Sequence, residues 1–132
     1  MKPAYLIDTD WVIHWLNDHP GISQRLTDIR GQGLAVSIVS LAELYEGVYY
    51  STDPDRSERQ LQNLLEGLTT LGIDRETCQV FGRERGRLRA AKARVPDFDL
   101  MIGATALRHN LILLTNNRRD FESIQGLRLE SR

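Results

Sequence analysis

Four carboxylates fall where apolar runs of the chain end, or where the helices that follow these runs begin: Asp8, Glu43, Asp99 and Asp120. If the runs are neighbouring parallel strands, all four side chains can meet at one edge of the sheet. Carboxylates within a few ångströms repel one another, and no lysine is placed to neutralise them. Hard divalent cations such as Mg²⁺ or Mn²⁺ resolve this conflict because they prefer oxygen ligands.

An acidic site with one or two such ions polarises a phosphodiester and activates water for attack on phosphorus. Three polar residues beside the acids are placed to orient them or to hold water: Thr9, Thr115 and Asn117. No histidine base is required, and the three histidines show no convergent spacing. The residue types therefore predict metal-dependent phosphodiester hydrolysis.

Each acid also has a purely structural interpretation. Ser40 and Glu43 have the spacing of a capping box, and Asp120 could cap a short last helix. Asp10 and Asp97 are expected to cap the helices that follow them. Asp8 fits this interpretation least, because no local helix is expected to need it. The case for function rests on the acids jointly.

The elements that must position these acids alternate along the chain. Short apolar runs predict strands at 4–7, 34–39, 71–73, 111–114 and 127–129. Helical spacing and turn signals predict helices at 11–17, 21–30, 40–50, 54–68, 75–94, 98–110 and 120–124. Unbroken apolar strands between helices are typical of an α/β fold with a mainly parallel sheet. In such folds the functional site lies outside the carboxyl ends of the strands.

The composition limits the class of protein. The chain has 132 residues, 41% of them hydrophobic and 27% charged, with a net charge of −1. This size predicts a single domain over 1–132. No apolar run is long enough to span a membrane, and the run before Asp8 is too short for a signal peptide. Cys78 is the only cysteine, which suits a reducing compartment, so we expect a cytoplasmic protein.

Four segments in order carry a resemblance to a known family: Leu6–Asp10, Ser40–Gly47, Asp97–Ala106 and Leu114–Phe121. With them, the whole chain resembles the PIN-domain ribonucleases, and most closely the VapC-type toxins of bacterial toxin–antitoxin pairs. The resemblance implies a PIN-like three-layer α/β/α sandwich with a sheet of four to five strands. It also implies Mg²⁺- or Mn²⁺-dependent endonucleolytic cleavage of RNA, with tRNA as a family-level expectation.

The resemblance also assigns roles. It maps the family's acids onto Asp8, Glu43 and Asp99. Its fourth acid falls at Asn117 in some members and at Asp120 in others, and we choose Asp120 because an amide is a weaker ligand. Asp10 departs from the pattern, which usually has a small polar residue there. A homodimer and an antitoxin seated in an apolar groove are implied as partners.

Basic and aromatic side chains leave two interpretations open. Six cationic residues between 83 and 94 wrap around one predicted helix, which is typical of a solvated face, yet three of them are candidates for RNA binding: Arg87, Arg89 and Arg94. Five aromatic residues fall on the first and third predicted helices and either fill the core or line a partner groove: Trp11, Trp15, Tyr45, Tyr49 and Tyr50.

Two other functions compete. A haloacid-dehalogenase-type phosphatase also begins with a strand and Asp-x-Asp, as Asp8 and Asp10 do, but its later paired acids and its lysine are missing. A PIN-fold module that binds RNA or protein without cutting is the stronger alternative. Retention of Asp8, Glu43 and Asp99 argues against it, because a scaffold has no need to tolerate their repulsion.

Overall fold

A computed structural model describes residues 2–132 as a three-layer α/β/α sandwich, which confirms the predicted fold class. All pairings in its five-stranded sheet are parallel, in the order β3-β2-β1-β4-β5. The strands are β1 (Tyr5–Ile7), β2 (Leu34–Ser37), β3 (Thr69–Leu71), β4 (Ile112–Leu114) and β5 (Leu129–Glu130). The first strand therefore lies at the centre, between the second and the fourth.

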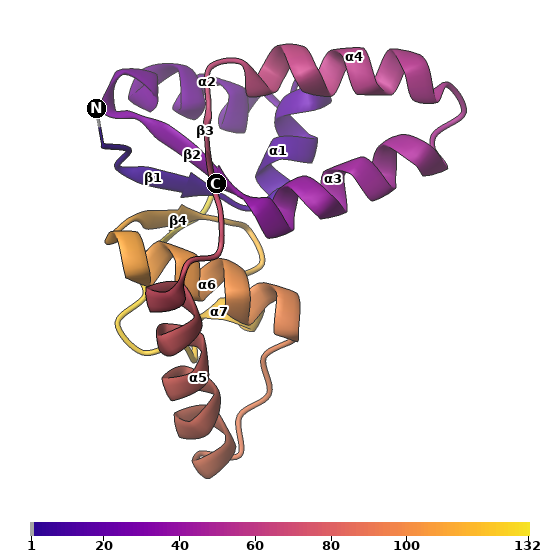
Figure 1. Ribbon diagram of the computed structural model, residues 1–132. Coiled ribbons are helices and arrows are strands. Elements are labelled where there is room, and N and C mark those ends of the chain that lie inside the picture. The colour runs from indigo at the N-terminus through magenta and orange to yellow at the C-terminus, as the bar shows by residue number, and fades with distance from the viewer. Residues whose placement is uncertain (1) are drawn as a thin grey trace.

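The helices fall into two groups, one on each face of the sheet (Figure 1). One group is α1 (Thr9–Leu16), α2 (Pro20–Ile29) with the short 3₁₀ turn η1 (Arg30–Gln32), α3 (Ile38–Tyr50) and α4 (Pro54–Leu65). The other group is α5 (Arg75–Ala90), α6 (Asp97–His109) and α7 (Arg118–Phe121). Helices α3 and α4 extend to one side of the sheet as a hairpin (Figure 1). Within residues 2–132, no helix has the length and apolar content to cross a membrane.

The central strand shows why its sequence is apolar throughout. Successive side chains of a strand point to opposite faces. Tyr5 and Ile7 accordingly pack in the core under α1 to α4, while Leu6 packs in the core under α5 to α7. Because both faces are covered, a run without alternation is what this position requires.

Helix α3 begins earlier than the sequence predicted. Ser37 ends β2 and its hydroxyl accepts a hydrogen bond from the backbone N–H of Ser40. The helix therefore starts at Ile38 rather than at Ser40, and the alternative interpretation of Ser40 and Glu43 as a capping box is wrong. The consequence is that Glu43 lies in the second turn of α3 rather than the first.

Four other elements, α5, β3, α7 and β5, also differ from their predicted bounds. Helix α5 ends at Ala90 instead of 94, because Lys92 takes a left-handed conformation with φ 56° and the chain folds back there. Strand β3 lies at Thr69–Leu71 instead of 71–73, since these residues pair with β2. Helix α7 covers Arg118–Phe121 instead of 120–124, and β5 covers Leu129–Glu130 instead of 127–129.

Candidate active site

Asp8 lies at the carboxyl end of the central strand and is 5% exposed. Its Oδ1 accepts a hydrogen bond from the backbone N–H of Thr9 at 2.8 Å, and its Oδ2 accepts one from the Thr115 hydroxyl at 2.7 Å. It is also the N-cap residue of α1. The prediction that Asp10 caps this helix, and that Asp8 has no helix to serve, is therefore wrong.

Thr9 connects the first strand end to helix α3. Its hydroxyl donates to Glu43 Oε1 at 2.7 Å and forms a second hydrogen bond, of 2.9 Å, with Ser40 Oγ. These contacts fix the half-buried Glu43 beside the end of β1. Thr9 thus orients one of the predicted acids, as the sequence had suggested for a polar neighbour.

Asp99 and Asp120 meet on the other side of this edge. Asp99 lies in the first turn of α6, and its carboxyl is in hydrogen-bonding contact with that of Asp120. Asn117 donates to Asp120 Oδ2 through Nδ2 at 2.7 Å, and its backbone N–H donates to Thr115 Oγ1 at 3.0 Å. Asn117 therefore holds Asp120 in place, and Thr115 links this pair to Asp8.

Asp10 is a fifth acid at the same edge. Its Oδ2 accepts a hydrogen bond from the backbone N–H of Asn116 at 3.1 Å, so it contacts the loop after β4 instead of capping α1. Its Oδ1 is buried without a hydrogen-bond partner among the described residues. Sequence reasoning assigned it a structural cap. Its place two residues beyond a strand end was the signal that could have added it to the site.

The acids lie close enough for their negative charges to affect one another's pKa values. Burial, the largest cause, and the charges of Asp10 and Asp99 together raise the pKa of Asp8 to about 7, while hydrogen bonds from Thr115 and Thr9 oppose this shift. The pKa of Asp99 is also raised to about 7, by burial first and then by the contact with Asp120 and the charges of Asp120, Glu43 and Asp10. In the part of the chain that the structure describes, none of the five acids forms an ion pair with lysine or arginine.

The donor chemistry of this edge fits a hard divalent cation. Every candidate ligand is a carboxylate oxygen, and the partnerless Oδ1 of Asp10 is available to a cation or to the water around it. Among residues 2–132, however, no three histidine, cysteine, aspartate or glutamate side chains are arranged around one point as a ready ligand group. Carboxylates must therefore turn toward a common centre when an ion binds.

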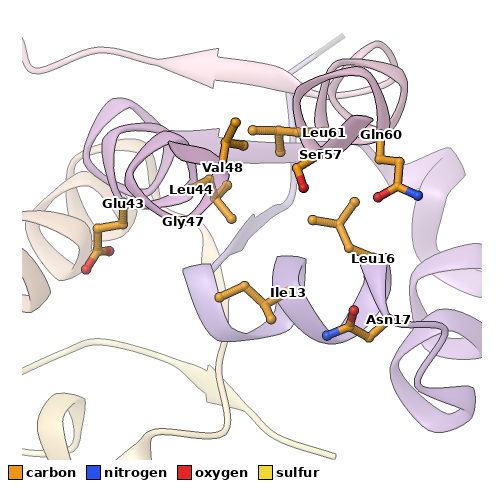
Figure 2. Close-up of a pocket in the computed structure, with 10 residues that line it drawn as sticks. All are labelled: Ile13, Leu16, Asn17, Glu43, Leu44, Gly47, Val48, Ser57, Gln60 and Leu61. Carbon is orange, nitrogen blue, oxygen red and sulfur yellow. The ribbon is translucent and has the colours of Figure 1, made fainter. Parts of the chain in front are cut away.

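An apolar groove adjoins the acids. It has a volume of about 270 Å³ and lies between α1, α3 and α4. Figure 2 shows Glu43 at one end of the groove, with Ile13 and Leu16 of α1 facing Leu44 of α3 and Leu61 of α4. Trp11 is fully buried in the core, whereas Tyr49 and Tyr50 are exposed farther along α3. The aromatic residues thus divide between core and surface.

The predicted basic residues also divide. Arg87 forms a forked pair with Glu84, at 2.8 and 2.9 Å, and donates to the carbonyl of Ser123 at 2.6 Å. These contacts join α5 to the segment after α7, so the structure does not bring Arg87 to the acids. Arg89 and Arg94 line a groove beside the start of α6.

The histidines have structural roles or lie apart from the acids. His19 caps α2 by accepting the backbone N–H of Ile22 on Nδ1, and it packs edge-to-face against His14. Burial and the nearby Arg108 lower the pKa of His109, which ends α6. No general base among them faces the carboxylates.

Comparison with known proteins identifies the family to which the chain belongs. The model of the PIN domain matches residues 5–127, so the chain belongs to the PIN domain family. It is 32% identical over 128 residues to Ribonuclease VapC2 of Haemophilus influenzae, covering 96% of each chain. It is 29% identical over 126 residues to the tRNA(fMet)-specific endonuclease VapC of Shigella flexneri, again covering 96% of each.

Solved structures give the same result. VapBC2 from Rickettsia felis bound to a DNA fragment from its promoter matches with a TM-score of 0.92, 27% identity and 98% coverage of both chains. DNA-bound VapBC from Salmonella typhimurium matches with a TM-score of 0.91, 28% identity and 98% coverage of both. Within the PIN domain family, the chain is thus a ribonuclease of the VapC type, as its sequence motifs had indicated.

Proposed function

We propose that this chain, acting as one nuclease domain over 1–132, hydrolyses RNA phosphodiester bonds with Mg²⁺ or Mn²⁺ held by Asp8 and Asp99. Glu43 and Asp120 support that ion directly or through water. The observation that carries the proposal is the raised pKa of Asp8 and of Asp99, each about 7, in a group of acids that lacks a cationic partner. A bound divalent cation relieves this repulsion and keeps both carboxylates ionised near neutral pH.

The chain's own residues prepare the site. Thr115 and the backbone N–H of Thr9 hold the Asp8 carboxylate in one orientation. The Thr9 hydroxyl does the same for Glu43, and the Asn117 amide does it for Asp120. When bound, the ion lowers the pKa of water and neutralises charge on the phosphate being attacked. These hydrogen bonds limit how far the carboxylates must turn when an ion binds, which lowers the entropy lost in forming the site.

The relatives guide the choice of substrate and partners. The Shigella relative is named for tRNA(fMet), and the similar solved structures contain VapB with VapC. We therefore expect a structured RNA of the tRNA class as substrate, in the cytoplasm, and a cognate antitoxin as inhibitor. The apolar groove beside Glu43 suits an apolar helix of that antitoxin, because Leu44, Val48 and Leu61 line it.

The decisive experiment compares RNA cleavage by the wild type with cleavage by Asp8→Asn and Asp99→Asn, with Mn²⁺ and with EDTA. Loss of one charged ligand should lower the cleavage rate by about 100-fold or more. Asp28→Asn, on the exposed face of α2, is the matched control and should cut like wild type. If both site variants cut as well as wild type, these acids do not perform the reaction.

A catalytically silent PIN-fold module gives a different pattern. Such a protein binds RNA but leaves it intact with every metal, and Asn substitution at the acids does not weaken binding. Sequencing the products of a positive reaction identifies the cleaved bond and tests the tRNA expectation.

A further inference from the structure

A second groove, separate from the apolar one, lies between the end of α5 and the start of α6. It has a volume of about 520 Å³ and is lined by Arg85, Arg89, Ala93, Arg94, Val95, Pro96 and Asp97. Three cationic side chains and one anionic side chain face it, so the groove is locally positive in a protein with a net charge of −1. Arginine suits phosphate because its planar group donates several hydrogen bonds at once.

The three arginines differ in whether they already have partners within the protein. Arg85 pairs with Asp97 at 2.7 Å, lies over the Phe81 ring at 5.7 Å and is only 17% exposed in its side chain. Arg89 and Arg94 are exposed, and neither has an ion-pair partner within the described part of the chain. Arg85 thus builds the wall of the groove, and the other two are available to a ligand.

The groove and the acids share one turn of helix. Asp97 and Asp99 both belong to the first turn of α6; Asp97 contacts Arg85 of α5, whereas Asp99 contacts Asp120 on another side. An α-helix with its side chains is about 10 Å across. The groove that holds the arginines and the acidic site therefore adjoin the same turn of α6.

A polyanionic substrate needs cationic side chains beside the acids. The five site carboxylates repel phosphates, and none of them is neutralised by a cationic side chain in the ion pairs of residues 2–132. Beyond the contribution of the proposed ion, affinity for RNA then comes from cationic side chains beside the site, through phosphate contacts and release of counterions.

We propose that Arg89 and Arg94 form a phosphate-binding subsite that holds the RNA strand next to the bond being cut. This inference rests on the proposed function, since it concerns the substrate of the same site. The two arginines bind phosphates without reading bases, so they set affinity and position rather than sequence preference.

The test measures RNA affinity in the Asp8→Asn background, where the strand stays intact. The double variant Arg89→Gln/Arg94→Gln should bind single-stranded RNA at least 10-fold more weakly. Because each lost phosphate contact removes about 0.7 from the slope of log K against log salt, the slope should fall by about 1.4. The matched control is Arg59→Gln/Arg83→Gln, which removes the same charge at exposed positions outside the groove.

The outcomes separate the two proposals. If the protein with intact acids neither binds nor cuts RNA, the proposed function fails. If it cuts RNA but the groove variant and the control bind alike, with the same salt slope, the phosphate subsite is wrong. Loss of antitoxin binding with RNA affinity retained would also overturn it, and would assign the groove to a protein partner. Sedimentation of both double variants checks that the oligomeric state is unchanged.

Discussion

Asp8 serves the fold and the site at the same time. Its two carboxylate oxygens hold Thr9 and Thr115, and its backbone N–H donates to the carbonyl of Leu114 at 2.9 Å. The sequence was sufficient to predict that Asp8, Glu43, Asp99 and Asp120 lie at one edge, because strand ends of a parallel sheet share that edge, but it did not add Asp10 to them. It was insufficient to separate a cap from a ligand, because hydrogen-bond direction depends on residues more than 100 positions away, as in the contact of Asp10 with Asn116.

The raised pKa values of Asp8 and Asp99 make stability depend on pH when metal is absent. Both groups ionise near 3.8 when unfolded and near 7 when folded. The folded state therefore binds more protons between these values, and the stability that these groups contribute falls as pH rises toward 7. Thermal unfolding in EDTA should show a midpoint that decreases between pH 5 and pH 7.5.

Two controls make this prediction specific. The Asp8→Asn/Asp99→Asn variant should show a flatter dependence over the same interval, since it lacks both titrating groups. Millimolar Mn²⁺ should raise the wild-type midpoint at pH 7.5, because the ion binds the native state, and should leave the variant unchanged. A variant with the wild-type slope in EDTA would contradict the assignment.

At the scale of elements, the order and type of every strand and α-helix followed from apolar runs and turn residues, whereas the 3₁₀ turn η1 was not predicted. The errors lie at the ends of the elements, where tertiary contacts determine which residue begins or ends a strand or helix. The expected strand at 71–73 moved to Thr69–Leu71 because Thr70 pairs with Val36 of β2. Helix α6 begins at Asp97 without a side-chain cap, and Asp97 instead pairs with Arg85 of α5. Local capping rules cannot anticipate such a partner.

Gly33 shows a backbone requirement that belongs to one element. It precedes β2 with φ 93°, and its carbonyl accepts hydrogen bonds from Ala4 and Tyr5 at the start of β1. A Cβ atom there would lie 2.8 Å from the Pro3 backbone. Gly33→Ala should therefore destabilise the fold by about 1–3 kcal/mol, measured by urea unfolding.

Gly31 offers the matched control for this change. A Cβ atom at Gly31 meets nothing within 4 Å among the described residues, and this residue has no positive φ. Gly31→Ala should leave the unfolding midpoint almost unchanged. Equal losses of stability at both positions would mean that backbone strain at Gly33 is not the cause of the destabilisation.

At the scale of the whole molecule, the exposed apolar surface is uneven. Ile38, Ile73 and Phe98 are each at least 40% exposed, and a hollow of about 360 Å³ beside Phe98 is lined by Val39, Ile73, Phe81 and Met101. Its rim is formed by Arg85, Arg89 and Asp97, which it shares with the arginine groove. Exposed apolar side chains gathered beside one hollow are typical of an interface. We predict that the apolar part of this surface joins two copies of the chain, with Arg89 at the edge of the interface and accessible to RNA.

The dimer prediction is tested by sedimentation. The double variant Ile73→Ser/Phe98→Ser should shift the chain toward monomer, because it removes apolar area from the centre of the interface. Tyr50→Ser, at the 86% exposed end of α3, is the control and should keep the wild-type mass. A wild-type protein that sediments as a monomer at all concentrations would contradict the dimer prediction.

The central position of β1 has a consequence for how the protein is made. This strand of residues 5–7 pairs with β4 at residues 112–114, and Asp8 needs the hydroxyl of Thr115. A ribosome has therefore translated most of the gene before the middle of the sheet can close. Until then the Asp8 carboxylate lacks its hydrogen bond from Thr115, so we expect a chain truncated before β4 to be inactive toward RNA.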